Sequence, residues 1–423
     1  MTALSGKEKE SVLYNRTLIP ADQVTVKVLD RLPRHDTIWD MHMAPDDTLY
    51  IGACVEHTAG MSAWLCSYRH DTGKVEYLAD MAEVTGESND SGHATQGKIH
   101  FSLCHDNDGL IYGATHCTTA PKGDIRWSPF SMYRDPIRSF PGSYLFVHDP
   151  KTRETRSLGI LTPNEGIRVM VMDRDRNLLH ITTYPKCHYL IYNLQKKTLE
   201  DLGRFAHLHQ LALFLDRKGN AYTTDSFGRM LRIAADTHRI ESLGVQLPHA
   251  HFRSGEHNIL WQVAKQPGRE VIYGATYVRD ARMFRYDMES NEMTDLGLAY
   301  GRREPLPIPE EVAIGGMTFG KDGSLYYTTA EGREPEDLPR SNPPRPYDPN
   351  APQDVPWRRK SPGHLIRYDI ETRGAEDLGI FGPEELPFNG RSCHGTTDSK
   401  GNLYFNQSVS TPPRFYIYRP ERS

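Results

Sequence analysis

Two histidines in one predicted hairpin could act together in acid–base chemistry. The stretch 97–116 reads as two strands, 98–104 and 110–116, joined by the polar turn Asp-Asn-Asp-Gly. His100 and His116 are equally distant from the centre of that turn. Regular pairing would therefore place their side chains opposite each other on adjacent strands, about 5 Å apart.

The next hairpin pattern repeats this spacing with different side chains. Arg168 and Tyr184 are symmetric about Arg176, and they align with the two histidines when the hairpins are superposed on their turns. An arginine binds a carboxylate bidentately, a histidine moves protons near neutral pH, and a tyrosine transfers a proton when cationic neighbours lower its pKa. Together these groups could neutralise a carboxylate, remove the adjacent proton and protonate a leaving oxygen, which are the steps of β-elimination from a uronic acid.

Further residues are predicted to bind substrate around this set. Gln210, Trp261 and Tyr277 occupy equivalent positions in later copies of the pattern, although packing is the commoner role of a core tryptophan. His42 and His394 lie near the expected inner strands of the first and last copies, where they would extend a binding groove.

The chemistry requires no cofactor, but a bound Ca, Zn or Mn ion is one possibility. Two His-x-His pairs place both imidazoles on one face of a strand, as a metal site would need. These pairs are His207 with His209 and His249 with His251. Hydrogen-bonded or solvated loop histidines are the other reading, and the sequence names no third ligand.

The elements that must position these residues come from an internal repeat. Units of four short strands recur seven times, each with an Asp/Gly/Asn turn after its first strand and most with Leu-Gly near the end. Units of about 40 residues with four strands are typical of β-propeller blades. We therefore predict one all-β domain over 1–423, a seven-bladed propeller of antiparallel four-stranded blades. The last copy stops at its third strand, so the segment 23–32 should supply the missing strand and close the ring.

Three segments fall outside the repeat. Residues 1–22 form an N-terminal extension, and insertions at 117–142 and 332–362 follow the second strands of their blades. Both insertions should emerge on the same face, either as decoration or as walls of a ligand groove.

Composition limits the class of partner and the location. The net charge of −5 over 423 residues argues against a nucleic-acid partner, while a local basic site for an anionic oligosaccharide stays possible. The first residues lack the apolar core of a signal peptide, no run reaches the length of a membrane span, and the six cysteines form no CxxC pair. We expect a cytoplasmic protein without membrane contact, although a removed leader would give the same picture.

The blade pattern together with His100, His116, Arg168 and Tyr184 resembles the seven-bladed propeller polysaccharide lyases, which include ulvan lyases and enzymes that cut rhamnose–glucuronate linkages. The resemblance implies a carbon–oxygen lyase that cleaves a uronate-containing glycan. It implies that Arg168 binds the carboxylate with help from one histidine, and that Tyr184 and the other histidine serve as acid and base. A related type, the oligogalacturonate lyases, uses a metal to neutralise the carboxylate.

Two other functions stay open on the same scaffold. A glycoside hydrolase or lactonase would need a carboxylate pair, which the aligned positions lack. A non-catalytic sugar-binding or scaffold propeller is also possible, because fold does not fix function.

Overall fold

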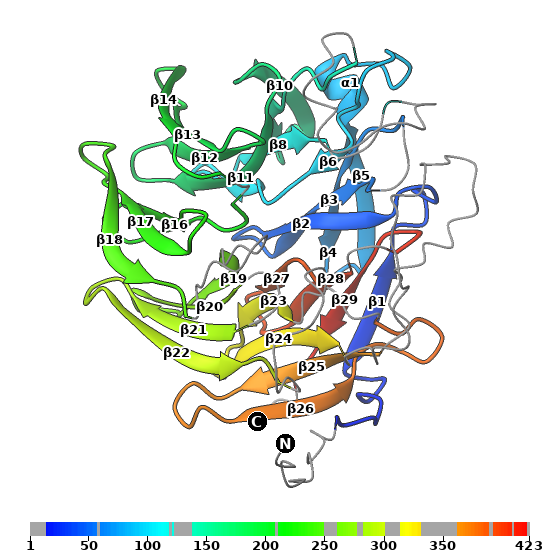
Figure 1. The fold of residues 1–423 in the computed structure, drawn as a ribbon. Coiled ribbons are helices and arrows are strands. Elements are labelled where there is room, and N and C mark those ends of the chain that lie inside the picture. Colours follow the sequence, from blue (N-terminus) through cyan, green and yellow to red (C-terminus); the bar gives the residue numbers. More distant parts are fainter. Residues whose placement is uncertain are drawn as a thin grey trace, which may run out of the picture.

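The structure is a computed structural model that describes residues 14–420 apart from 57–59, 118–120, 122–137, 208–209, 249–259, 277–281, 301–313, 331–361, 389–391 and 408–409. Seven antiparallel sheets follow one another around a ring, as predicted (Figure 1). The one helix among the described residues, α1 (Met81–Thr85), is a single short turn after the first blade. No helix in this part of the chain has the length and apolar character of a membrane span.

The blades are numbered here from the N-terminus. Blade one contains β2 (Thr37–Met43), β3 (Thr48–Cys54), β4 (Trp64–Arg69) and β5 (Lys74–Asp80). Blade two contains β6 (Lys98–Ile99), β7 (Cys104–His105), β8 (Ile111–His116), β9 (Tyr144–Asp149) and β10 (Glu154–Ile160). Blade three contains β11 (Gly166–Asp173), β12 (Leu178–Tyr184), β13 (His188–Asn193) and β14 (Thr198–Arg204).

The remaining blades repeat the pattern. Blade four contains β15 (Phe214–Leu215), β16 (Ala221–Thr224), β17 (Arg229–Ile233) and β18 (Ile240–Gln246). Blade five contains β19 (Leu260–Lys265), β20 (Val271–Thr276), β21 (Arg282–Asp287) and β22 (Glu292–Leu298). Blade six contains β23 (Ile314–Phe319), β24 (Leu325–Ala330), β25 (Gly363–Tyr368) and β26 (Ala375–Ile380). Blade seven contains β27 (Gly395–Thr397), β28 (Leu403–Gln407), β29 (Arg414–Tyr418) and β1 (Val24–Val28).

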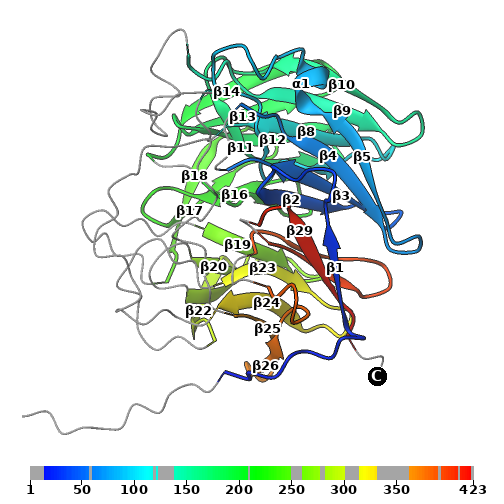
Figure 2. The ribbon, with the colours of Figure 1, turned by 90° about the vertical axis from the view of Figure 1, so that its right-hand side faces the viewer.

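The predicted closure is confirmed. β1 is the outermost strand of blade seven and pairs antiparallel with β29, from Val24 opposite Tyr418 to Val28 opposite Arg414 (Figure 2). Just before β1, the chain runs along the outer edge of blade six, where Leu18 bridges Ile380. The N-terminal segment therefore joins the last two blades and covers two sheet edges that would otherwise be exposed.

A repeated aspartate–tyrosine contact stabilises the first turn in blades four, six and seven. In blade four, Asp216 accepts hydrogen bonds from the amides of Lys218 and Asn220 through Oδ1, and from the Tyr222 hydroxyl through Oδ2 at 3.0 Å. Blades six and seven repeat the tyrosine contact at 2.8 Å. The aspartate closes the turn and fixes the second strand to it, so these acids are structural.

The inner strands of three blades carry a β-bulge at the same level. The register shifts at Trp39 in β2, at Arg168 in β11 and at Trp261 in β19. In blade two the inner strand is interrupted between Ile99 and Cys104, so that β6 and β7 pair separately with β8. Bulges bend the strand and re-aim side chains, and here they lie at the level of the residues predicted to act.

Candidate active site

The structure brings together the four residues predicted to be catalytic. Arg168 Nη1 donates a hydrogen bond to His116 Nε2 at 3.2 Å, and the Arg168 guanidinium carbon lies 5.6 Å from the centre of the Tyr184 ring. The His100 and His116 rings are 5.4 Å apart, and the His116 and Tyr184 rings are 6.0 Å apart. We call these four residues the channel cluster.

The strand register that brings these residues together differs from the predicted register. Lys98, not His100, is opposite His116, and Gly166, not Arg168, is opposite Tyr184. The predicted direct pairing was wrong in both hairpins because each inner strand departs from regular pairing before the turn. The bulge at Arg168 and the interruption after Ile99 shift the register, and the side chains converge through those irregularities instead.

His100 has a defined tautomer. Its Nδ1 lies 2.9 Å from the backbone oxygen of Arg168, and a carbonyl oxygen can only accept, so Nδ1 carries the proton. Burial, followed by the charge of Arg168, lowers the pKa of His100 well below its usual value, so the ring is neutral. Its Nε2 is buried and has no hydrogen-bond partner among the described residues. The Nε2 lone pair of His100 is therefore unused among the described residues.

The Tyr184 hydroxyl is protonated and could therefore donate a proton. Burial raises the pKa of its hydroxyl, and the Arg168 charge offsets only part of that effect. The expected lowering by cationic neighbours is therefore not the net result, and the phenol keeps its proton at neutral pH. Tyr184 is partly exposed, whereas His100, His116 and Arg168 are buried, so the phenol marks the side from which a ligand would approach.

The structure adds three residues to this site that the sequence reasoning missed. Lys98 is buried at 1% exposure and forms an ion pair with Glu56, which also accepts a hydrogen bond from Trp39 Nε1 at 2.7 Å. The Lys98 ammonium lies 4.8 Å from the Trp39 ring centre, and Trp39 stacks on His100 at 4.8 Å with an interplanar angle of 21°.

Signals for these residues existed but were weak. A lysine two positions before His100 in an apolar strand could have been read as a buried charge. Trp39 lies at the bulge of β2, the feature that Arg168 occupies in β11 and Trp261 in β19, and a bulge leaves no mark in the apolar pattern. Among the channel cluster and these three added residues, Arg168 and Lys98 are two cations against the one carboxylate of Glu56, and this excess of positive charge suits an anionic ligand.

The residues predicted to bind substrate do not form one group with the channel cluster. His394 lies beside the channel cluster, with its ring 6.4 Å from Phe101 and its Nδ1 3.4 Å from Asp40 Oδ1. Trp261 is buried, and its indole donates to the Ile314 carbonyl at 2.7 Å. Gln210 is buried and accepts a hydrogen bond from Thr224 at 3.3 Å.

One of those residues, His42, is elsewhere. His42 is near the turn end of β2, three residues or about 10 Å along the strand from Trp39. Its Nε2 lies 2.7 Å from Nδ1 of His105, and Arg174 donates to the other nitrogen of His105. Desolvation, then the nearby His105 ring, lower the pKa of His42 to about 3. Tyr277 lies outside the described residues.

The proposed metal ligands cannot be assembled from what the structure describes. His209, His249 and His251 lie outside the described residues, and the Arg204 guanidinium donates to His207 at 3.3 Å. Within the described ranges, no group of three or more His, Cys, Asp or Glu side chains could hold a metal ion. Most of both insertions, 118–120 with 122–137 and 331–361, is likewise outside those ranges.

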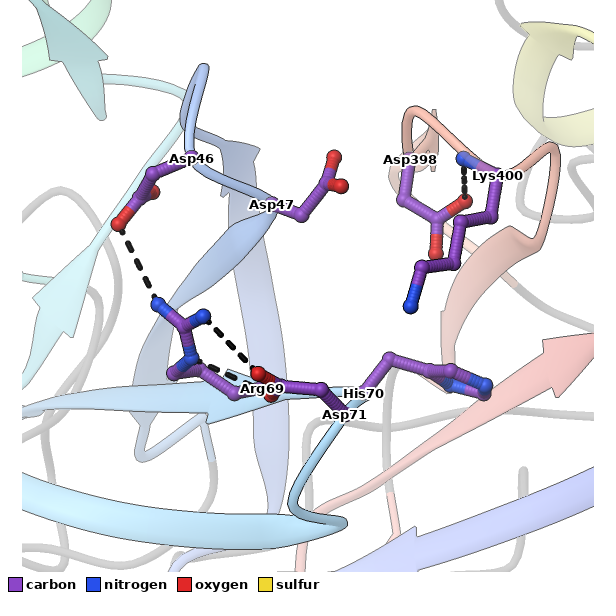
Figure 3. Close-up of a pocket in the computed structure, with 7 residues that line it drawn as sticks. All are labelled: Asp46, Asp47, Arg69, His70, Asp71, Asp398 and Lys400. Atoms are coloured by element: carbon purple, nitrogen blue, oxygen red, sulfur yellow. Dashed lines mark hydrogen bonds and ion pairs between the residues drawn. The ribbon is translucent and has the colours of Figure 1, made fainter.

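A second group of charged residues is at the opposite ends of the inner strands, on turns of blades one and seven (Figure 3). Arg69 forms ion pairs with Asp71 at 3.0 Å and Asp46 at 3.5 Å, and Asp47 accepts a hydrogen bond from the Ser399 amide at 2.7 Å. The last contact joins blade one to blade seven. The two ion pairs hold turns of blade one together, and the Asp47 contact spans the ring closure, so we assign this small pocket a structural role.

Comparisons with known proteins support the fold. No family model matches the chain, and no curated protein matches it. Among solved structures, a streptogramin B lyase aligns with a TM-score of 0.57 at 10% identity, covering 94% of this chain and 98% of that one. The virginiamycin B lyase from Staphylococcus aureus aligns with a TM-score of 0.56 at 10% identity, covering 94% and 99%.

Other similar structures are not described as lyases. The extracellular domain of the putative one component system BT4673 from B. thetaiotaomicron aligns with a TM-score of 0.56 at 11% identity, covering 95% of this chain and 40% of that one. The WD40 repeats of RRP9 align with a TM-score of 0.52 at 11% identity, covering 96% and 99%. At these identities the likeness shows the fold alone. The chain is an all-β seven-bladed propeller, and its function must be argued from its own residues.

Proposed function

We propose that this protein is a carbon–oxygen lyase that cleaves a uronate-containing oligosaccharide, such as one with rhamnose–glucuronate linkages, by β-elimination. The observation that carries the proposal is the convergence of a buried cation, a neutral histidine with an available lone pair and a protonated phenol in the channel cluster. The resemblance to propeller polysaccharide lyases and the fold shared with propeller lyases support it.

The first requirement of the reaction is a neutralised carboxylate. The proton at C5 of a uronate becomes acidic only when the negative charge on the adjacent carboxylate is compensated. Arg168 supplies a planar guanidinium for this purpose. His116 accepts from Arg168 Nη1 and so orients the guanidinium, while Lys98 adds positive charge to the same region.

We assign the base and the acid on the basis of this geometry. His100 Nε2 accepts the C5 proton, because its lone pair is available while Nδ1–H is held by the Arg168 carbonyl. The electron pair of the C5–H bond becomes the C4–C5 double bond, the C4–O4 bond breaks, and the Tyr184 hydroxyl donates its proton to O4. No oxidant, reductant or water is consumed. A bound anionic substrate would also raise the pKa of His100, which favours proton acceptance.

The test is a continuous assay for the conjugated double bond of the product, followed by its ultraviolet absorbance, on a panel of uronate oligosaccharides. His100→Gln and Tyr184→Phe should each reduce kcat by about 10²–10⁴-fold, the usual contribution of a general base or acid. Matched controls come from a second histidine–tyrosine pair in blade three, His180 and Tyr189, joined at 3.0 Å. His180→Gln and Tyr189→Phe should retain near wild-type kcat.

The outcomes separate the candidate functions. Absence of unsaturated product on every uronate substrate, beside an active control lyase, would refute the proposal. New reducing ends without unsaturation would indicate a hydrolase instead. Binding of oligosaccharide without turnover, unaffected by His100→Gln or Tyr184→Phe, would indicate a sugar-binding propeller.

A further inference from the structure

The inner strand of blade two contains a strained residue next to the predicted base. Phe101 has φ of +43°, in the left-handed region that side chains with a Cβ rarely adopt. Most other non-glycine residues with positive φ among the described ranges are in turns between strands, whereas Phe101 interrupts β6 and β7. Such conformations persist only where neighbours fix them, and they concentrate at functional sites.

Two neighbouring blades fix this kink. From blade one, Asp40 Oδ2 accepts hydrogen bonds from the amides of Ser102 and Leu103, the latter at 2.6 Å. From blade three, the amide of Met170 donates to the Phe101 carbonyl at 2.9 Å. The kink is therefore held on both sides by contacts between residues some 60 to 70 positions apart in the chain.

The kink determines where His100 lies. His100 immediately precedes Phe101, whose ring contacts it edge-on at 4.4 Å, and it stacks on Trp39 on the blade-one side. Asp40 is the residue after Trp39, so the same short segment of β2 both carries the stacking ring and holds the kink. A shift of the Asp40 carboxylate would move His100 relative to Trp39 and Arg168.

Burial of this carboxylate points to a specific task. Asp40 is 1% exposed, and burial raises the pKa of its carboxyl to about 7 while the amides of Leu103 and Ser102 lower it. Burying a carboxylate costs free energy unless hydrogen bonds compensate for its lost hydration. Its second oxygen faces His394. The kink is thus attached to an acceptor that replaces the strand pairing lost between β6 and β7.

We propose that Asp40 is a positioning residue, which holds the 101–103 kink so that His100 presents Nε2 toward substrate. The catalytic consequence rests on the lyase function proposed above, whereas the placement of His100 can be tested without any substrate. The test is NMR spectroscopy of the full-length chain with ¹⁵N-labelled histidine. The His100 ring signals among the 19 histidines are assigned by their loss in His100→Gln.

Asp40→Ala removes both acceptor contacts and should change the ring shifts of His100 and its Nδ1–H tautomer signature. Asp40→Asn keeps an acceptor oxygen in place and should restore the wild-type signals. The matched control is Asp216→Ala in blade four, which removes a carboxylate that also binds two backbone amides but lies in a turn. It should leave the His100 signals unchanged.

A second variant covers the case in which Asp40→Ala does not fold. Asp40→Glu keeps the charge but displaces the carboxylate by one methylene, and it should also shift the His100 signals. Unchanged His100 signals in a folded Asp40→Ala or Asp40→Glu protein would overturn the proposal. Equal changes in Asp216→Ala would overturn it too, because they would reflect general loosening.

Activity provides the third measurement. If the protein is a lyase, Asp40→Ala should lower kcat by about 10²-fold with little change in KM, as expected when a catalytic group is misplaced by about 1 Å. Asp40→Asn should recover most of that loss. An unchanged kcat in an Asp40→Ala protein whose His100 signals have moved would overturn the catalytic part. Absence of lyase activity in the wild type would instead refute the proposed function, and the NMR criterion would still decide the placement of His100.

Discussion

The ion pair between Lys98 and Glu56 gives a quantitative test of how the site is built. Lys98 is buried at 1% exposure, and Glu56 is 23% exposed. Glu56→Gln would leave the Lys98 ammonium in the interior without its counter-charge. Removing one partner of a buried pair typically costs about 3–5 kcal/mol. Because Glu56 is partly exposed, and because glutamine can still accept from Trp39, we expect the lower end, about 3 kcal/mol.

A double-mutant cycle separates the cost of the unpaired Lys98 charge from the other effects of each substitution. Lys98→Met should cost less than Glu56→Gln, because the partly exposed Glu56 carboxylate can be hydrated once its partner is gone. The double variant Glu56→Gln/Lys98→Met should be more stable than Glu56→Gln alone, because no unpaired buried charge remains. The measurement is urea denaturation followed by circular dichroism for all four proteins, with the free energy of unfolding extrapolated to water.

An exposed ion pair supplies the control. Glu376 pairs with Arg367 at 3.3 Å, and both side chains are about half exposed. Glu376→Gln should change the free energy of unfolding by about 0–1 kcal/mol. If Glu56→Gln costs no more than this control, Lys98 does not behave as a buried charge. The account of the site as a region of net positive charge would then be wrong.

Two further predictions concern stability. The free energy of unfolding should fall as pH drops from about 6.5 toward 4, because burial lowers the folded-state pKa of His148 and His180 to about 4 while the unfolded chain binds protons near pH 6.5. Asp40, with its pKa raised to about 7, opposes this trend as a single group, and a urea midpoint independent of pH would contradict the prediction. Tyr404→Phe should lower the free energy of unfolding by about 1–2 kcal/mol, because it removes the 2.8 Å hydrogen bond to Asp398. Thermal unfolding of this variant, compared with Tyr222→Phe in blade four, measures the loss.

Much of the fold could be predicted from local patterns. Each copy of the repeat carries its own turn signal, as in the Asp216 turn whose acid binds the following amides and the Tyr222 hydroxyl. Those contacts join residues only a few positions apart, so they can be predicted from the local sequence. The ring closure was also predictable, because a last copy without its fourth strand leaves an edge that a free terminal strand such as β1 can cover.

Four of the clustered residues were picked out from the sequence, but their geometry was not, and Lys98, Glu56 and Trp39 were missed. His100, His116, Arg168 and Tyr184 were identified from their positions relative to the turns, and they do converge. Their assumed pairing was wrong, because a bulge adds a residue to one strand without changing the apolar pattern that the sequence displays.

The sequence by itself determined the class of architecture and the kinds of side chain available for chemistry, because strand periodicity and turn residues act over short distances. Only the tertiary structure decided the register of the inner strands, the addition of Lys98 and Glu56 to the site, and the neutral state of His100. These features depend on contacts between blades, such as Asp40 with the 102–103 amides, which join residues more than 60 positions apart. Burial and the proximity of charges arise from such contacts, and no local pattern of residue types encodes them.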